Sequence, residues 1–268
     1  MNTNNNYSKE HLEYIEKNRK YAQSIKFFRI LIIVAFFLLW ELLTKFNILD
    51  AFIFSSPSRI VNTIITLFNE KVLFMHIGVT LFETVVGFVL STLLGTIIAI
   101  MLWWFPKVSK ILDPYLVILN ALPKIVLGPI LIVWIGAGIK TVITITVLVS
   151  IVVTITSVLD GFNEISNEQF FLMRSLGATK KQTLTYVVLP ASIPNIVTAL
   201  KLNVGMSWVG AIVGEFLISR AGLGYLAVYG GQVFKLDLVM TGVLILCALA
   251  AAMYYFVCWF EKQLLRQR

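Results

Sequence analysis

The sequence predicts an all-α polytopic membrane protein with six transmembrane helices and one polar helical hairpin. Of its 268 residues, 58% are hydrophobic and only 13% are charged, whereas a soluble domain carries about 25% charged residues. The apolar residues form runs of the ~20 residues that a helix needs to cross a bilayer. Lipid offers no partner to free backbone amides, and the alternation typical of a transmembrane β-barrel is missing, so the runs are expected to be helices.

The first element is a polar segment, residues 1–26, which we expect to stay on the protein. It is too long and too charged for the start of a signal peptide, and no small-residue cleavage site follows the first apolar run. Its basic residues, Lys9–Lys26, favour an amphipathic helix on an anionic membrane surface. A disordered tail is the alternative.

Six apolar runs follow, and each predicts one span. Two prolines and a lysine, Pro123, Lys124 and Pro129, interrupt the third run and are expected to bend it. A six-helix domain of residues 27–262 and a basic tail of residues 263–268 result. The spans are expected at about Phe27–Phe46, Val79–Phe105, Pro114–Ile139, Thr141–Leu159, Ile193–Ile218 and Leu238–Phe260.

Lysine and arginine set the expected orientation. With the N-terminus in the cytoplasm, 14 basic residues fall on the inner side and 5 on the outer side, and the other three, Lys45, Lys124 and Lys201, lie within spans. The positive-inside rule therefore predicts that both termini are cytoplasmic. The polar segment between the fourth and fifth spans then faces the cytoplasm as well.

That polar segment has the local signals of a helical hairpin over residues 163–190. Ser166 with Gln169, and Thr179 with Gln182, have the spacing of capping boxes and mark two helix starts. Gly177 stands where the first helix needs a left-handed residue to end. Pro190 and Pro194 are expected to bound the second helix before the fifth span begins.

The first helix of the hairpin carries apolar residues beside a positive charge. These are Phe170, Phe171, Leu172 and Leu176, with Arg174 among them. Aromatic side chains on a short surface helix favour docking into the groove of a partner protein. Packing against the membrane surface or the other spans is the alternative, and the pattern alone does not separate the two.

The hairpin contains R-S-L-G, then nine intervening residues, then V-V-L-P. This pattern resembles the coupling motif of the permeases of binding-protein-dependent ABC transporters, the MetI-like family. Gly177, Val187, Leu189 and Pro190 fill the motif positions. The usual Glu-Ala-Ala opening is replaced by residues 171–173, Phe-Leu-Met, and Glu83 stands where relatives often carry Arg. The resemblance extends over about residues 54–262 and is closest to the branch that imports nitrate, taurine, alkyl sulfonates and some vitamin precursors. Further segments that carry it are F-S-S-P-S-R-I (54–60), L-D-P-Y-L (112–116), L-P-K-I-V-L-G-P-I-L-I-V-W-I-G-A-G (122–138) and G-E-F-L-I-S-R-A-G-L-G-Y-L (214–226).

The resemblance implies the membrane subunit of an importer, located in the cell membrane and not itself an enzyme. It implies a second permease subunit, with a homodimer favoured, a cytoplasmic ABC ATPase dimer on the hairpins and an extracytoplasmic solute-binding protein. The chain has no phosphate-binding loop of the G-x-x-x-x-G-K-[ST] type. No cofactor is therefore expected on it, and ATP and magnesium are expected on the partner ATPase. The residues expected at the ATPase contact are Phe170, Phe171, Arg174, Ser175, Leu176, Gly177, Ala178, Thr179, Leu189 and Pro190.

Four polar or aromatic residues within the spans are candidates for the translocation pathway: Lys124, Ser207, Trp208 and Glu215. Charged residues in membranes usually face a pathway or the bundle interior. For Glu215 the alternative is a structural hydrogen bond or an ion pair with Arg220. For the other three the alternative is packing or pairing.

Two further sequence features concern the fifth span. Lys201 is expected to reach back to the membrane surface, with a pathway role as the alternative. The small residues of the run from Gly210 to Gly214 allow another helix to approach closely.

Other functional classes fit less well. An ATP-independent channel or secondary carrier is the main rival, but no internal repeat supports it. No cluster of His, Asp or Glu within the spans suggests a membrane enzyme. The net charge of +8 comes from residues that flank the apolar runs, which indicates contact with lipid and not with nucleic acid. Among solutes, small sulfonates lead, ahead of nitrate-like anions, taurine and pyrimidine vitamin precursors.

Overall fold

The computed structural model describes residues 9–266, and the side chains of residues 12–263. Every regular element within residues 9–266 is helical. The elements are α1 (Lys9–Lys45), α2 (Ala51–Phe54), α3 (Pro57–Asn69), α4 (Leu73–Trp104), α5 (Pro106–Ala121), η1 (Lys124–Leu127), α6 (Gly128–Ile135), α7 (Ile139–Asn163), α8 (Asn167–Ser175), α9 (Lys180–Thr183), η2 (Leu184–Val188), α10 (Leu189–Ala191), α11 (Ile193–Ile218), α12 (Leu223–Gln232) and α13 (Leu236–Arg266). The all-α prediction is confirmed.

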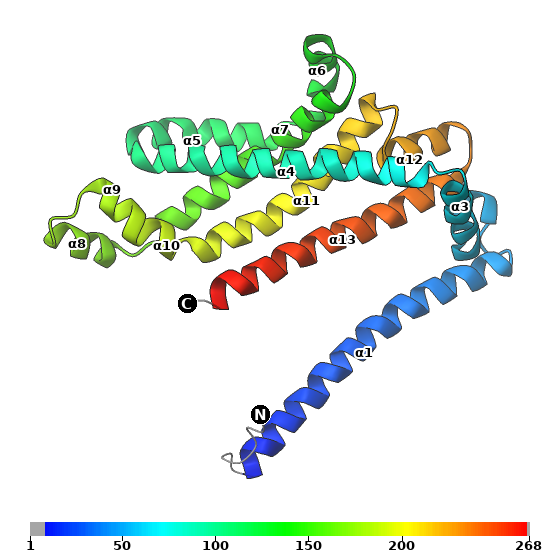
Figure 1. Ribbon diagram of the computed structural model, residues 1–268, viewed down its shortest axis with the longest axis horizontal. Coiled ribbons are helices and arrows are strands. Elements are labelled where there is room, and N and C mark those ends of the chain that lie inside the picture. The colour runs from blue at the N-terminus through cyan, green and yellow to red at the C-terminus, as the bar shows by residue number, and fades with distance from the viewer. Residues whose placement is uncertain (1–8, 267–268) are drawn as a thin grey trace. The chain divides into compact units, whose positions relative to one another are not determined.

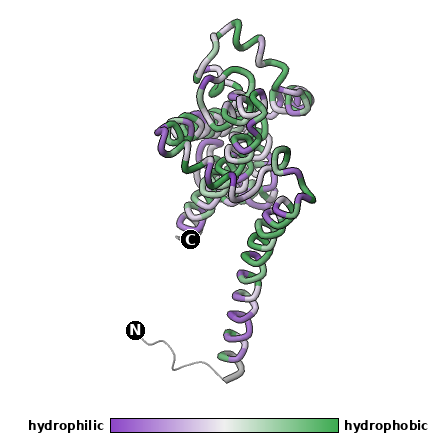
Figure 2. The backbone as a smooth tube through the Cα atoms, turned by 90° about the vertical axis from the view of Figure 1, so that its right-hand side faces the viewer, coloured by the Kyte–Doolittle hydropathy of each residue, from purple (hydrophilic) through white to green (hydrophobic). Residues whose placement is uncertain are grey.

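The chain divides into two compact units, up to Thr63 and from Ile64 onward. In the first unit, α1 is one helix that joins the polar segment to the first predicted span, and its hydropathy changes along its length (Figure 2). No glycine or proline falls within α1 to stop it, and an ion pair of 2.8 Å joins Lys20 to Glu16 one turn away. The helix predicted for Lys9–Lys26 is thus continuous with the span, and residues 1–8 lie outside the described part.

The second unit is a bundle built on α4, α7, α11 and α13 (Figure 1). The contact between α7 and α11 is the most extensive in the bundle, and glycines on α11 face α7 within it. A Cβ at Gly210 would lie 2.6 Å from the Cα of Thr146, and one at Gly214 would lie 3.0 Å from the Cα of Val142. The close approach predicted from the small residues of α11 is therefore confirmed, since any side chain there would separate the two backbones.

Five helices within the described residues are long and apolar enough to cross a membrane: α1 from Leu12, α4, α7, α11 and α13 up to Gln263. The segment Pro106–Ala121 with Lys124–Ile135 makes a sixth if this bent pair is one span. The two halves meet at 85°, so the predicted bend is confirmed.

The boundaries predicted for the third span, Pro114–Ile139, are wrong. Pro114 lies inside α5, which begins at Pro106, and the second half ends at Ile135. The bend follows from Leu122, which adopts an extended conformation directly before Pro123, as steric contact with a proline ring requires.

Two apolar clusters fill the bundle. One gathers Ala99, Leu102, Ile155, Val158, Leu159, Phe162, Val188 and Ala199, and we call it the hairpin-end cluster. The other gathers Leu67, Leu73, Val204, Trp208, Leu223, Leu226, Leu246 and Val257. Between them, the buried Asn203 amide donates to the hydroxyls of Ser91 (3.1 Å) and Thr92 (2.7 Å) and ties α11 to α4.

Candidate functional site

The polar segment forms the predicted helical hairpin, which lies at one end of the bundle, whereas α12 lies at the other (Figure 1). Its first helix, α8, begins after Ser166, but the Ser166 side chain makes no capping hydrogen bond. The predicted start is therefore right and the predicted capping box is not formed. The helix ends at Gly177, with φ of +70°.

The end of α8 is a Schellman motif. The amide of Ala178 donates to the Met173 carbonyl (2.9 Å), and the amide of Gly177 donates to the Arg174 carbonyl (3.0 Å). Both bonds require the left-handed residue between the two helices. The glycine that the sequence singled out is therefore the residue that turns the chain.

The second half of the hairpin begins with the predicted capping box. The Thr179 amide donates to Gln182 Oε1 (2.8 Å), and the Gln182 amide donates to Thr179 Oγ1 (3.3 Å). After α9 the chain forms the π-helical turn η2, in which the Leu189 amide donates to the Leu184 carbonyl. A π-turn before Pro190 compensates for the amide that proline lacks. The backbone stays helical through Pro190 and the helix ends at Ala191, and Pro194 lies in the first turn of α11, so the second helix ends between the two prolines as expected.

One face of α8 packs against the bundle and the other is exposed, so that packing and docking each apply to one face. Phe170 is half-buried and packs against the hairpin-end cluster. Phe171, Leu172 and Leu176 point outward, with 67%, 60% and 72% of their surface exposed. Adjacent residues on a helix point about 100° apart, so Phe170 attaches the helix to the bundle while Phe171 is free to meet a partner.

Beside the exposed residues lies a groove of about 370 Å³ between α8 and the second half of the hairpin. It is lined by Gln169, Leu172, Met173, Tyr186, Val187, Pro190 and Ala191. On the other side of α8, Arg174 and Ala178 line a second hollow with Phe170 and Lys180. Ser175 donates its hydroxyl to the Phe171 carbonyl (3.0 Å), and Leu189 packs against the hairpin-end cluster.

Lys180 connects the hairpin to the end of α4, and sequence reasoning did not single it out. Its ammonium donates to the Trp104 carbonyl (2.5 Å). It also lies over the rings of Trp103 and Trp104, 5.6 and 5.4 Å from their centroids, within the range of a cation–π interaction. The two partners are 76 residues apart in sequence, so no local spacing could have revealed the contact.

Next to the hairpin, two hydrogen bonds hold the start of α11 to the end of α7. Ser192 donates its hydroxyl to the Gly161 carbonyl (3.1 Å), and Asn195 donates its amide to Glu164 Oε2 (2.6 Å). Lys180 thus ties the hairpin to α4, and the two helices that flank the hairpin, α7 and α11, are tied to each other where it joins them.

The four pathway candidates lie on two different elements. Lys124 is at the bend before α6, where its ammonium donates to the Asn120 carbonyl (3.3 Å). Ser207, Trp208 and Glu215 are on α11 and are buried inside the bundle. Trp208 belongs to the second apolar cluster, which agrees with the packing alternative for that residue.

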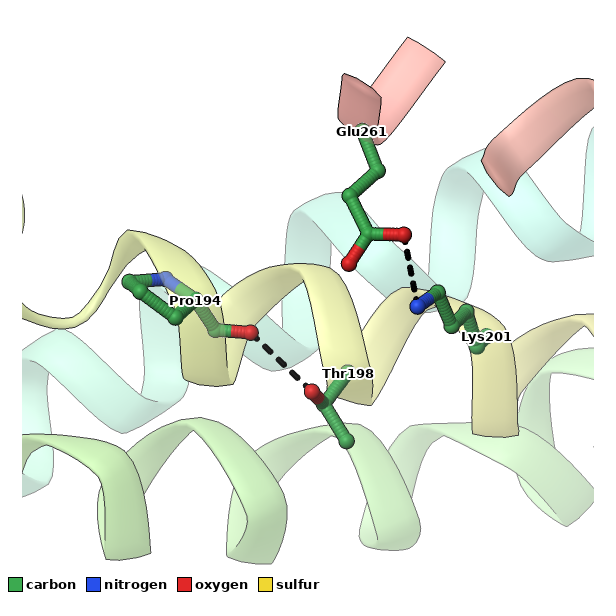
Figure 3. A network of polar contacts seen from close by, with 4 residues as sticks. All are labelled: Pro194, Thr198, Lys201 and Glu261. Atoms are coloured by element: carbon green, nitrogen blue, oxygen red, sulfur yellow. Dashed lines mark hydrogen bonds and ion pairs between the residues drawn. The ribbon is translucent and has the colours of Figure 1, made fainter. Parts of the chain in front are cut away.

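Lys201 has a partner that the sequence did not suggest. Its ammonium forms an ion pair of 2.6 Å with Glu261 on α13 (Figure 3). One turn closer to the start of α11, Thr198 donates its hydroxyl to the Pro194 carbonyl (3.0 Å). The ion pair joins α11 to α13, which neither the reach to the membrane surface nor the pathway alternative included.

Glu215 belongs to a polar cap around the first turn of α12. Its Oε2 accepts from the amides of Gly224 (2.6 Å) and Tyr225 (3.3 Å). Two side chains of α4 complete the cap, since the Gly222 amide donates to His76 Nδ1 (3.0 Å) and the Leu223 amide to Thr80 Oγ1 (2.8 Å). The first amides of a helix lack partners within it and carry a partial positive charge. Glu215 therefore has the structural hydrogen bonds considered for it, with backbone amides as its partners.

The comparison with known families decides the class of the protein. Residues 87–266 match the family described as "Binding-protein-dependent transport system inner membrane component". The chain belongs to this family. It is a permease subunit of an ABC importer, and the resemblance noted in the hairpin is confirmed.

Individual relatives agree with this assignment. The chain is 29% identical to a "Probable ABC transporter permease protein" of Haemophilus influenzae, over 86% of this chain and 93% of the relative. It is 26% identical to the "Putative aliphatic sulfonates transport permease protein SsuC" of Bacillus subtilis, over 86% and 83%. It is 31% identical to the "Formylaminopyrimidine transport permease protein ThiX" of Halalkalibacterium halodurans, over 70% and 74%.

A solved structure shows the same fold. The permease matches 96% of a chain from the MetNI methionine ABC transporter in an inward-facing conformation, over 74% of its own length, with a TM-score of 0.63 and 19% identity. At that identity the similarity concerns the fold alone.

Proposed function

We propose that this permease couples ATP hydrolysis on a separate ABC ATPase to solute movement through the exposed face of its hairpin. The observation that carries the proposal is the division of α8 into an attached face and a free one. Phe171, Leu172 and Leu176 offer apolar surface to a partner, and Lys180 fixes the hairpin to α4. Large exposed apolar side chains on a stiff, capped helix favour docking into a groove. ATP and magnesium are placed on the partner ATPase.

The mechanism follows from how the hairpin is attached. When the two ATPases approach each other on binding ATP, a rigid hairpin moves with them, whereas a flexible loop would absorb the displacement. The contact of Lys180 with the end of α4 passes the movement to that helix, and the bond from Ser192, at the start of α11, to the end of α7 keeps the two helices that flank the hairpin together. The bundle then changes between two packings, which is the bistable element that such coupling requires.

The remaining partners and the orientation belong to the same proposal. A second copy of the permease completes the pathway, and an extracytoplasmic solute-binding protein delivers the solute. The excess of lysine and arginine on one side supports a cytoplasmic position for both termini and the hairpin, on the side where the ATPase would bind. The membrane is the plasma membrane of the cell.

For the solute, small sulfonates are the leading proposal. The similarity to a relative named for aliphatic sulfonates supports it over 86% of this chain. A formylaminopyrimidine is the second candidate, because the relative named for that compound is 31% identical. Titration of the purified partner binding protein with ethanesulfonate, taurine, nitrate and formylaminopyrimidine separates the candidates. Binding of the pyrimidine alone would refute the sulfonate assignment.

Co-purification tests the coupling proposal. An affinity-tagged permease extracted from its own membranes is expected to bring an ABC ATPase with it. The double variant Leu172→Asp, Leu176→Asp is expected to lose the ATPase but still to elute as a folded membrane protein, because both side chains are exposed. Asn167→Asp is the matched control, since it adds a negative charge at the start of the same helix, where charge is favourable. Retention of the ATPase by the double variant would refute the proposed contact.

A further inference from the structure

Two carboxyl groups face each other inside the bundle, one from α4 and one from α11. Glu83 has none of its surface exposed and Glu215 has 1%. The two groups lie within hydrogen-bonding reach of each other. Ionisable side chains this deep in a membrane helix require a partner, so the two carboxyl groups need a hydrogen-bond donor or a positive charge near them.

The cap of α12 supplies partners for one oxygen of the pair only. The amides of Gly224 and Tyr225 both donate to Glu215 Oε2. The preceding two amides are taken by the side chains of His76 and Thr80. The first turn of α12 therefore has no free donor for Glu83.

Glu83 has no donor from elsewhere in the described part of the chain. Both of its carboxyl oxygens are buried without a hydrogen-bond partner, and so is Glu215 Oε1. An unpartnered buried carboxylate is far more costly than an unpartnered neutral group. A single proton would supply the missing hydrogen-bond donor, because a carboxylic acid can donate whereas a carboxylate only accepts.

No positive side chain compensates the two acids. The other ionisable side chains of the cap are His76 of α4 and Tyr225 of α12, whose rings stack at 6.1 Å. His76 accepts from the Gly222 amide with Nδ1, so that its imidazole is neutral. Within the described residues, no lysine or arginine acts on either carboxyl, and neither α7 nor α13 brings a charged group to them.

We propose that Glu83 and Glu215 form a proton-binding site, in which one proton is shared as a hydrogen bond between a carboxylic acid and a carboxylate. Two negative charges within hydrogen-bonding reach repel strongly in a medium of low polarity, and one proton between them changes the repulsion into an attraction. Glu215, which accepts from two amides and the positive end of α12, is the carboxylate, and Glu83 is the acid that donates to it.

The shared proton has a structural consequence. It joins α4 to α11 directly, and through Glu215 to the first turn of α12. Glu83 is 21 residues before Trp104, which at 1.5 Å per residue is ~32 Å along α4 from the Lys180 contact. A helix that the hairpin moves at one end is thus held near the other end by a hydrogen bond that exists only while the proton is bound.

Infrared spectroscopy of the purified, assembled transporter at neutral pH tests the site. A protonated carboxyl absorbs through its C=O stretch at a frequency separate from that of a carboxylate, and the band shifts in D₂O. Wild-type protein is expected to show this band, and Glu83→Gln and Glu215→Gln are each expected to lose it. Glu70→Gln, which replaces an exposed acid, is the matched control and is expected to keep the band.

The wild-type protein tests the proposal even if the variants do not fold. Its carboxylic acid band is expected to disappear when the transporter is denatured at neutral pH, because a solvated glutamic acid is ionised there. Absence of the band from the folded wild type would overturn the proposal, as would a band that persists in both glutamine variants. Retention of sodium or calcium by the wild type, lost in Glu83→Gln, would show that a metal cation and not a proton balances the pair.

Discussion

Replacing Gly177 by valine tests the hairpin at the residue that turns it. Gly177 has φ of +70°, and a Cβ built there meets no atom within 4 Å. The substitution therefore causes no clash with neighbours, and its whole cost is conformational. A left-handed backbone costs an L-residue about 1–2 kcal/mol, and a β-branched side chain is among the least tolerated there.

That cost applies to the hairpin and not to the bundle. About 1–2 kcal/mol lowers the population of the correctly turned hairpin by a factor of about 5 to 30 relative to its alternatives. Gly177 is exposed and belongs to neither apolar cluster, so insertion and thermal stability are expected to change little. Uptake by proteoliposomes that contain the ATPase and the binding protein is expected to fall, by at most about the same factor.

Two controls separate backbone strain from side-chain size. Gly177→Asn is expected to keep most of the uptake, because asparagine visits the left-handed region readily. Gly177→Ala is expected to lie between asparagine and valine. Wild-type uptake by Gly177→Val would refute the reasoning, and so would equal loss in the asparagine and valine variants.

Four further substitutions test other parts of the structure. Phe170→Ala is expected to destabilise the protein by about 2 kcal/mol, roughly half the cost of truncating a fully buried Phe. Phe171→Ala is expected to change stability by less than about 0.5 kcal/mol and to weaken ATPase binding. Thermal melts and an ATPase pull-down distinguish the two variants, and the reverse pattern would contradict the assigned faces of α8. Lys180→Met removes a hydrogen bond and a cation–π contact worth about 1 kcal/mol, so the ATPase should still bind while ATP-driven uptake falls; unchanged uptake would show that this contact transmits nothing. Gly222→Ala places a Cβ 2.2 Å from Glu215 Oε2 at a φ of +118°, and a loss of at least about 2 kcal/mol is expected in thermal melts; a wild-type melting temperature would contradict the described cap.

Local chemistry in the sequence was sufficient for the elements that depend on near neighbours. Gly177 was identified as the left-handed end of α8, and Thr179 with Gln182 as a capping box, and both are present. The bend at Pro123 is another such case, because a proline restricts the residue directly before it. Each of these features involves residues within about five positions of each other, and the sequence therefore specifies them.

The effect of a proline on a helix is harder to predict from near neighbours alone. The third span was predicted to start at Pro114, yet this proline lies in the interior of α5, which begins at Pro106. Pro190 and Pro194 were expected to bound the second helix, and a π-turn carries that helix through Pro190 before it ends at Ala191. In both cases the proline signal is real, but surrounding helix packing decides whether the chain breaks or adjusts.

Taken alone, the sequence determined the fold class, the apolar runs, the hairpin and the family motif within it. Only the tertiary structure decided that Phe170 faces inward and Phe171 outward, that Lys180 meets Trp104, and that Glu83 meets Glu215. The reason is physical: periodicity and turn chemistry are properties of neighbouring residues, whereas the partner of a buried charge is chosen by how distant helices pack.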